Sequence, residues 1–339
     1  MTRASRARRL ATAAVYGGGG LGLAGAGLAT LLRQEARLAR RRVESRTSKA
    51  DPPTGEGRYG RYRGPEVVLA VLGDSSAVGL GVDRAEQTPG VLIASALAEL
   101  AERPVRLVKV AVSGARSADL ARQVERVLPQ RPDVAMVMIG ANDVTSRSKP
   151  ALAVRDLAAA VRALRETGCE VVVGTCPDLG TIRPVAQPLR TLGRRWSRQL
   201  AAAQTMAVVA EGGRTVSLGS LLGPQFASDR TMFSRDEFHP SAAGYAAAAA
   251  CLLPSVADAI GVWPAAADRS TRGLRRVSLR PIAQAAASAA GRPGTEVQPA
   301  SVDGAEAGPR GPWALLRRRR PQRLPAVTPA AEPAAATDR

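Results

Sequence analysis

The sequence predicts a three-layer α/β/α sandwich built around a five-stranded parallel sheet. Short apolar runs alternate strictly with longer helical patterns, which is typical of a parallel sheet covered by helices on both faces. The strand candidates are nearly continuous apolar runs, as expected for strands that are buried on both sides. The chain has 339 residues, 45% hydrophobic and 23% charged, so it contains enough apolar material for one sizeable core.

The expected elements follow one another along the middle of the chain. The predicted strands are Val67–Leu72, Val105–Val112, Val134–Ile139, Glu170–Gly174 and Thr215–Leu218. The predicted helices are Gly90–Ala101, Ala118–Leu128, Leu152–Thr167, Leu189–Ala210 and Ala242–Leu253. In such sheets the ligand crevice lies beyond the carboxyl ends of the strands, and functional residues are expected at that edge.

The N-terminal region has a pattern of its own. Residues 10–32 carry no charge and are long enough to cross a membrane as a helix, with basic residues in 1–9 and from Arg33 onward. We favour a membrane anchor over a cleaved signal peptide, which would fit the basic start and the small-residue triplet at 24–26. A soluble helix fits less well because the segment has no polar face. Arginines on both sides leave the orientation open.

The folded domain is expected to span residues 65–262. Residues 33–64 are interpreted as a basic linker. Residues 263–339 are rich in Ala, Pro and Arg and have little apolar periodicity to offset the entropy of ordering them, so we expect a disordered tail. We therefore expect a chain that starts near Pro65 to be soluble and active.

The net charge of +19 lies in the two ends of the chain. Residues 1–64 carry 14 basic and 4 acidic side chains, and residues 263–339 carry 13 and 6. Residues 65–262 are nearly neutral, with 21 and 19. The 10 aromatic residues, almost none of them beside arginine clusters, offer little surface for stacking on bases. We expect no nucleic-acid partner, and a monomer.

The cysteines and the single histidine argue against a metal site or a disulfide framework. Cys169, Cys176, Cys251 and His239 lack the short spacings of zinc ligands. Cys169 and Cys176 bracket an extended run that holds them about 23 Å apart, beyond the reach of a disulfide. We expect buried structural thiols, no metal and no cofactor.

Four polar or glycine-bearing turns follow predicted strands or precede the last helix. They are Gly73-Asp74-Ser75-Ser76, Ser113-Gly114, Gly140-Ala141-Asn142-Asp143 and Asp236-Glu237-Phe238-His239. These turns should converge on one edge of the sheet. A serine hydroxyl needs an adjacent base to act as a nucleophile, and His239 is the only imidazole in the chain. Asp236 is spaced to accept the second ring N–H and fix the tautomer.

These turns, in this order, resemble the four blocks of the SGNH hydrolase family, also called GDSL esterases. The resemblance covers about residues 65–262 and implies a flavodoxin-like fold and a serine esterase or lipase. It implies Ser75 as the nucleophile. It also implies three oxyanion donors, namely the backbone N–H groups of Ser75 and Gly114 and the side-chain amide of Asn142. Ser76 stands where the namesake motif has leucine, which bears on the subfamily and the pocket shape rather than on the chemistry.

The other acidic residues of these turns receive different interpretations. We expect Asp74 and Asp143 to be local hydrogen-bond acceptors that hold their turns, and the Glu237 side chain to point away from the crevice. Ser75 and His239 are expected to stand in an open crevice rather than in the core.

Together these features predict a serine hydrolase that cleaves carboxylic esters, of lipids or acetylated carbohydrates, through a Ser75–His239–Asp236 triad and an acyl-enzyme. Two alternatives stay open: an acyltransferase that uses the same triad, and a non-catalytic envelope-binding protein. The stretch Asp178–Pro188 is a candidate pocket rim. Its residues Leu179, Ile182 and Val185 either face an acyl chain or fold back on the core.

Overall fold

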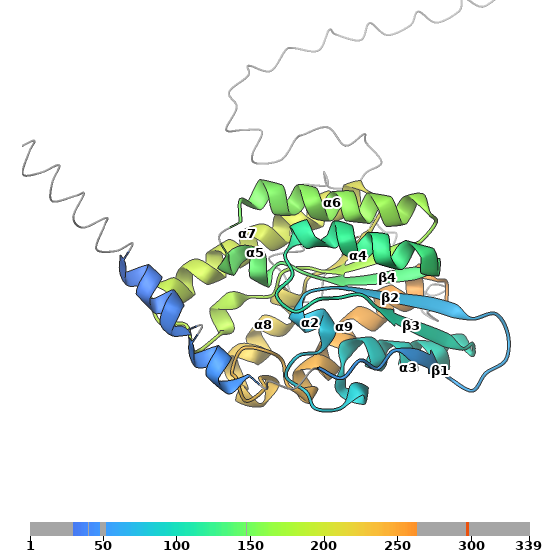
Figure 1. Cartoon of the computed structure of the whole chain (residues 1–339), viewed down its shortest axis with the longest axis horizontal. Helices are drawn as coiled ribbons and strands as arrows, with labels where there is room; N and C mark the ends of the chain where they lie inside the picture. The colour runs from blue at the N-terminus through green and yellow to red at the C-terminus, as the bar shows by residue number, and fades with distance from the viewer. Residues whose placement is uncertain (1–29, 40, 48–51, 147, 263–295, 298–339) are drawn as a thin grey trace, which may run out of the picture.

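A computed structural model of the chain describes residues 30–39, 41–47, 52–146, 148–262 and 296–297. Figure 1 shows one sheet lying between two layers of helices. The predicted three-layer α/β/α arrangement is therefore confirmed.

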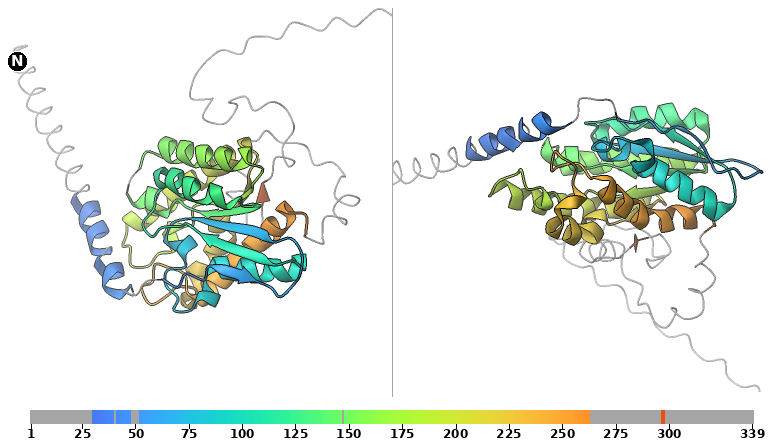
Figure 2. Two further views of the ribbon diagram at one scale, coloured as in Figure 1. Left: turned by 45° about the vertical axis from the view of Figure 1, so that its right-hand side comes forward. Right: turned by 90° about the horizontal axis from the view of Figure 1, so that it is seen from below.

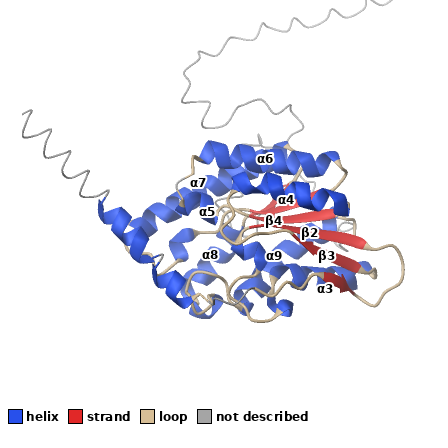
Figure 3. Cartoon of the chain, in the orientation of Figure 1, coloured by secondary structure: helices blue, strands red, loops and turns tan. Residues whose placement is uncertain are grey.

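The sheet contains seven strands in the described residues, in the order β1-β3-β2-β4-β5-β6-β7 (Figure 3). The parallel strands are β2 (Val67–Gly73), β3 (Val105–Lys109), β4 (Val134–Met138), β5 (Glu170–Gly174) and β6 (Arg214–Val216). The antiparallel edge strands are β1 (Gly57–Tyr59) and β7 (Glu296–Val297). Met138 of β4 pairs with Gly73 on one side and Gly174 on the other, so the carboxyl ends of three neighbouring strands lie level.

Helices cover both faces of the sheet. On one face lie α3 (Pro89–Ala101), α8 (Leu218–Ser228) and α9 (Ala242–Ala259), and on the other α4 (Leu120–Val127), α6 (Pro150–Glu166) and α7 (Leu189–Ala210). The short helices α2 (Ser75–Val78) and α5 (Ala141–Thr145) follow β2 and β4. Single 3₁₀ turns occupy Ala85–Gln87, Ser117–Asp119, Leu128–Gln130, Leu179–Thr181 and Arg230–Met232.

Strands β2 and β4 contain only apolar residues and glycine because each face of the sheet is buried. Successive side chains of a strand point to opposite faces. Leu69 and Val71 of β2 pack into the core cluster under α3 and α9, whereas Ala70 and Leu72 pack into the cluster under α4 and α6. Cys169 is buried in the second cluster, which agrees with the expected structural role of that thiol.

One segment of the predicted linker is helical. Residues 30–39 and residues 41–46 are helical. These two stretches are together called the N-terminal helix below, and they project from the end of the domain (blue in Figure 2). Of the predicted anchor at 10–32, residues 10–29 lie outside the described residues. Among the described helices, α9 alone is long and apolar enough to cross a membrane, and 44% of that stretch is buried inside the protein.

The sheet has more strands than predicted because two edge strands come from the predicted linker and tail. β1 has no apolar run of its own, and it forms by pairing with β3, whose outer edge would otherwise leave backbone groups unpaired. β7 pairs in the same way along β6. Helix α8 was not predicted either, since Gly219, Gly223 and Pro224 weaken its helical pattern.

Candidate active site

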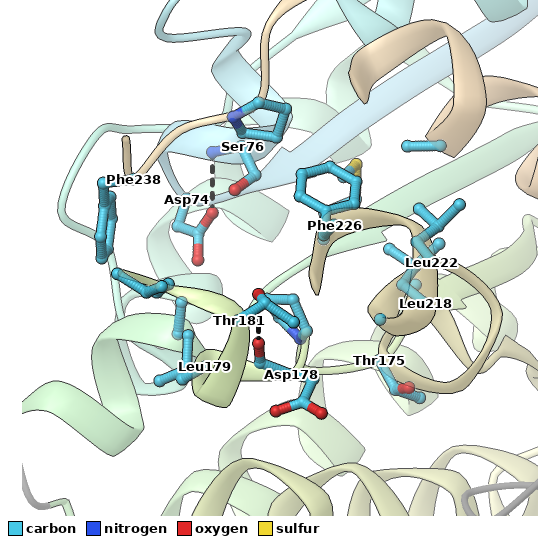
Figure 4. A pocket seen from close by; sticks show the side chains of 18 of the residues that line it. Asp74, Ser76, Thr175, Asp178, Leu179, Thr181, Leu218, Leu222, Phe226 and Phe238 are labelled. Carbon is cyan, nitrogen blue, oxygen red and sulfur yellow. Dashed lines mark hydrogen bonds between the residues drawn. The ribbon is translucent and has the colours of Figure 1, made fainter. Parts of the chain in front are cut away.

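The turn that carries Ser75 is held tightly against the sheet. Gly73 has a φ of +132°, and a Cβ atom at that position would lie 1.9 Å from the carbonyl oxygen of Met138, so a side chain does not fit there. The Asp74 N–H donates to the same carbonyl at 3.0 Å. The Asp74 carboxylate caps α2 by accepting the Ser76 N–H at 2.9 Å (Figure 4). Ser75, the first residue of α2, is thereby fixed in position, and Asp74 acts as the expected local acceptor.

Two buried glutamines, which the motifs do not include, brace this edge of the sheet. Gln123 of α4 donates to the Gly73 carbonyl at 2.9 Å and accepts the Gly73 N–H at 2.7 Å. Gln204 of α7 donates to the Ile139 carbonyl at 3.1 Å and accepts the Cys176 N–H at 2.8 Å. Gln123 lies on the otherwise apolar buried face of α4, whereas the buried face of α7 around Gln204 also carries Ser197 and Thr205. A single amide side chain in an apolar helix face needs a buried hydrogen-bond partner, and this pattern is the sequence signal by which Gln123 could have been found.

The turn before α9 organises Asp236 and His239. The Asp236 Oδ1 atom accepts three hydrogen bonds, from the Ser234 hydroxyl at 2.8 Å, the Phe238 N–H at 2.9 Å and the His239 N–H at 2.8 Å. Glu237 adopts a φ of +56°, which turns the chain sharply between the two residues. The Glu237 side chain pairs with Arg46 at 2.9 Å rather than with His239. The second carboxylate oxygen of Asp236 is therefore directed at the histidine.

A continuous chain of hydrogen bonds joins the three residues. His239 Nδ1 lies 2.6 Å from Asp236 Oδ2, and His239 Nε2 lies 3.0 Å from Ser75 Oγ. The structure thus brings these predicted site residues together over 164 positions of sequence. We expected Ser75 and His239 to stand in an open crevice, but the structure buries both side chains: Ser75 is 7% exposed and His239 is 6% exposed. Each of the two side chains covers part of the other, because they are in hydrogen-bond contact.

Burial and hydrogen bonds set the charge states of the acidic groups. Burial by itself would raise the pKa of Asp236, but the hydrogen bonds and charge of His239 and the backbone N–H groups outweigh it and hold the pKa well below its usual range. Asp74 has a different balance, and burial raises its pKa to about 6. Asp236 therefore stays ionised at neutral pH and accepts from the imidazole.

The loop after β3 is fastened to α5 beside these residues. The Asn142 side-chain amide donates to the Ala115 carbonyl at 3.0 Å. The Asp143 carboxylate accepts from the Ser117 hydroxyl at 2.8 Å and from the Ser117 N–H at 3.1 Å. Ser117 lies 26 positions away in the loop after β3, so Asp143 joins two turns and is not the local acceptor that we expected. Gly114 is exposed, has a φ of +81°, and has open space where a side chain would be. Gly114 and Asn142 line the same cavity.

Thr47 is a site residue that the motifs do not include. Its hydroxyl lies 3.0 Å from Asp236 Oδ2 and 2.9 Å from the Val43 carbonyl, and it donates to one or the other. Thr47 follows directly on the N-terminal helix, so only the tertiary structure connects it with Asp236. No local pattern in the sequence points to it.

Two cavities lie beside the turns that carry Ser75 and His239, and residues adjacent to this pair line them. The smaller one, of about 90 Å³, lies against Ser76 and Phe238 and is walled by apolar residues of α8 (Figure 4). The larger one, of about 540 Å³, reaches from Gly114 and Asn142 to the N-terminal helix. Leu179 and Ile182 line both cavities and Val185 lines the larger one. These three side chains also pack in one small apolar cluster, so both interpretations of the Asp178–Pro188 stretch hold.

A serine, a histidine and an aspartate joined in this order at the carboxyl edge of a mostly parallel sheet form the arrangement used by serine hydrolases. The profile of the GDSL-like Lipase/Acylhydrolase family matches residues 71–247. The chain belongs to this family, and the resemblance seen in the four turns is confirmed. As a class, the protein is therefore a hydrolase that acts on ester bonds.

Similar proteins are known at the levels of sequence and structure. The chain is 46% identical over 222 residues to a GDSL-like esterase of Mycobacterium tuberculosis, an alignment that covers 62% of this chain and 71% of the relative. Among solved structures, TesA matches 57% of this chain and 98% of its own at 24% identity and a TM-score of 0.44. A catalytic mutant of Axe2, an acetylxylan esterase from Geobacillus stearothermophilus, matches 57% and 94% at 20% identity and a TM-score of 0.44.

Proposed function

We propose that the protein is a serine hydrolase that cleaves carboxylic esters through a covalent acyl-enzyme. The nucleophile is the Ser75 hydroxyl, the general base is His239, and Asp236 orients the imidazole and stabilises its charged form. The observation that carries the proposal is the unbroken hydrogen-bond chain from Ser75 Oγ through both ring nitrogens of His239 to Asp236 Oδ2. The relative at 46% identity, a GDSL-like esterase by name, supports an ester as the substrate.

The reaction follows from these contacts in two stages. His239 Nε2 takes the proton of Ser75 as its oxygen attacks the ester carbonyl, and the tetrahedral intermediate collapses when the same proton passes to the leaving alcohol. Water then enters, gives a proton to His239, and attacks the acyl-enzyme, which releases the acid and restores Ser75. The low pKa of Asp236 keeps a negative charge beside the imidazolium that forms in both stages.

The oxyanion of each tetrahedral intermediate needs hydrogen-bond donors aimed at it. We assign this role to the backbone N–H groups of Ser75 and Gly114 and to the side-chain amide of Asn142. One N–H of that amide is engaged by the Ala115 carbonyl, which orients the group and leaves the other N–H for the substrate. The bond also ties the Asn142 donor to the loop that carries Gly114.

We further propose that the ester belongs to a lipid or to an acetylated carbohydrate, and that residues 10–32 attach the protein to a membrane, with secretion after signal cleavage as the alternative. We assign the catalysis to the domain of residues 65–262, with β1 as its N-terminal extension. No cofactor takes part in the proposed chemistry.

Labelling with a fluorophosphonate probe tests the proposed nucleophile. The wild-type chain should be labelled on Ser75 and should hydrolyse 4-nitrophenyl acetate, and Ser75→Ala should lose both properties. A folded wild-type chain that resists the probe would contradict the mechanism and favour a binding protein. An added alcohol acceptor that diverts most of the acyl group from water would make the protein an acyltransferase.

A further inference from the structure

The larger cavity beside the proposed active site is lined mainly by apolar side chains. Besides Gly114 and Asn142 at one end, the domain lines it with the apolar residues Val144, Leu179, Ile182, Val185, Leu189, Trp196 and Phe238, and also with Gly193 and the polar residues Arg116, Thr145 and Ser146. Its volume of about 540 Å³ lies within the range of pockets that bind small molecules. An apolar pocket that begins at proposed oxyanion donors suits the hydrocarbon part of an ester.

The N-terminal helix supplies the remaining wall of this cavity. Ala36, Ala39 and Val43, spaced three and four residues apart, fall on one face of the helix and line the cavity. Ala39 is buried to 7% exposure, whereas Arg33, Arg37 and Arg41 on the other side of the helix are exposed. Glu44 of the helix also lines the cavity. The helix therefore presents its small apolar residues and one carboxylate to the pocket, and its cationic residues to solvent.

Contacts at both ends of this helix fix it over the pocket. The Glu35 carboxylate accepts the Leu189 N–H at the start of α7, at 3.3 Å. At the other end Arg46 pairs with Glu237 at 2.9 Å, and Thr47 contacts Asp236 at 3.0 Å. Since Glu237 and Asp236 belong to the turn that carries His239, this wall is joined directly to the proposed catalytic machinery.

The two cavities differ in what they can hold. The smaller one has about 90 Å³ and the larger one about 540 Å³, so the larger one offers about six times the room for a long chain. His239 must protonate the leaving alcohol, so the alcohol lies on the histidine side, and the carbonyl oxygen faces Gly114 and Asn142. The acyl chain is the remaining substituent of the carbonyl carbon, and the larger cavity, which begins at Gly114 and Asn142, is the roomier of the two that it can enter.

We propose that the N-terminal helix is part of the substrate site, and that Ala36, Ala39 and Val43 form the wall that binds a linear acyl chain and sets its preferred length. This inference rests on the proposed esterase function and adds its substrate class, esters of medium or long unbranched acids. The small side chains of Ala36 and Ala39 leave room in the larger cavity, and a larger side chain at either position would shorten the space for the acyl chain.

Acyl-chain selectivity of full-length variants tests this inference. The measured quantity is the ratio of kcat/KM for 4-nitrophenyl octanoate to that for 4-nitrophenyl acetate. Ala39→Trp and Ala36→Phe should each lower this ratio about tenfold or more, because a pocket that loses room discriminates by about that factor per methylene. Gln34→Trp, an aromatic substitution at an exposed position of the same helix, should leave the ratio unchanged.

Each outcome has a definite meaning. A ratio unmoved in both Ala36→Phe and Ala39→Trp would overturn the inference, as would an equal fall in Gln34→Trp. Ala36 is half-buried, so Ala36→Phe remains informative if Ala39→Trp does not fold. Acetate esters of longer alcohols form a second arm, and an equal effect of Ala39→Trp on alcohol length would overturn the acyl assignment. Failure of the wild-type chain to hydrolyse any ester would instead overturn the proposed function.

Discussion

At the scale of single residues, the chemistry depends on a 3.0 Å contact between His239 Nε2 and Ser75 Oγ. We expect Ser75→Ala and His239→Ala each to lower ester hydrolysis by about four orders of magnitude or more, because nucleophile and base act as one unit. Neither variant removes a large apolar side chain, so both should melt close to the wild type. Parallel rate and thermal-melt measurements check this, and near wild-type turnover in either variant would refute the triad.

Asn142 should behave differently from the triad. Asn142→Ala removes one oxyanion donor and leaves the nucleophile and base in place, so kcat should fall by roughly two to three orders of magnitude while the acyl-enzyme still forms. The variant also loses the hydrogen bond to Ala115, so a melting curve must accompany the kinetics. A change in KM alone would make Asn142 a ground-state contact.

The buried carboxyl of Asp74 predicts a pH-dependent stability. Burial raises its pKa to about 6, above the value of about 3.9 in an unfolded chain. The folded state therefore binds the proton more tightly, and this group lowers stability as pH rises from about 4 to about 6. Asp74→Asn removes the ionisation but keeps an oxygen to cap Ser76. At pH 7 this variant should have an unfolding free energy that is higher by at most about 3 kcal/mol, and a higher thermal midpoint. At pH 4 neither quantity should change. Equal effects at both pH values would contradict this origin.

At the scale of elements, β1 extends the domain beyond its predicted start. Tyr59 packs against the core, and Glu56 accepts the Lys109 N–H at 2.9 Å. A chain of residues 65–262 should still be soluble and hydrolyse short esters, but it should melt below a chain of residues 52–262. If the loss of β1 lowers the unfolding free energy by about 2 kcal/mol, the thermal midpoint of a domain of this size falls by roughly 4–8 °C. Calorimetry of the two chains compares them directly, and equal midpoints would make β1 dispensable.

At the scale of the whole molecule, the proposed attachment through residues 10–32 predicts where the protein is found in the cell. Residues 10–32 are long and uncharged, and residues 65–262 are nearly neutral, so we expect the full-length protein to sediment with membranes and to resist extraction by high salt. Complete release by salt would indicate arginines bound to anionic lipid instead of a spanning helix. A shortened chain in the medium, beginning after Ala26 or Ala29, would favour a cleaved signal.

The sequence by itself determined the features that are local along the chain. The strands are recognisable because a doubly covered sheet requires continuous apolar runs, and the four turns because a reactive serine, a glycine turn, an amide and an Asp–His pair each occupy a few adjacent residues. Parallel topology then predicts that these turns meet, and the 3.0 Å and 2.6 Å contacts at His239 agree with that expectation. Family membership is likewise carried by these local blocks.

Only the tertiary structure decided what depends on contacts between distant segments. Gln123 and Gln204 hold the ends of strands through hydrogen bonds to the Gly73 and Ile139 carbonyls. Strand β1 forms because it pairs with the otherwise unpaired edge of β3. The N-terminal helix has only a short apolar stripe, at Ala36, Ala39 and Val43, and its spacing does not say which surface covers it. Its place over the larger cavity is fixed by Thr47 and Arg46, whose partners Asp236 and Glu237 lie about 190 positions away in sequence. Sequence periodicity reports burial within one element, and it carries no information about which distant surface covers that element.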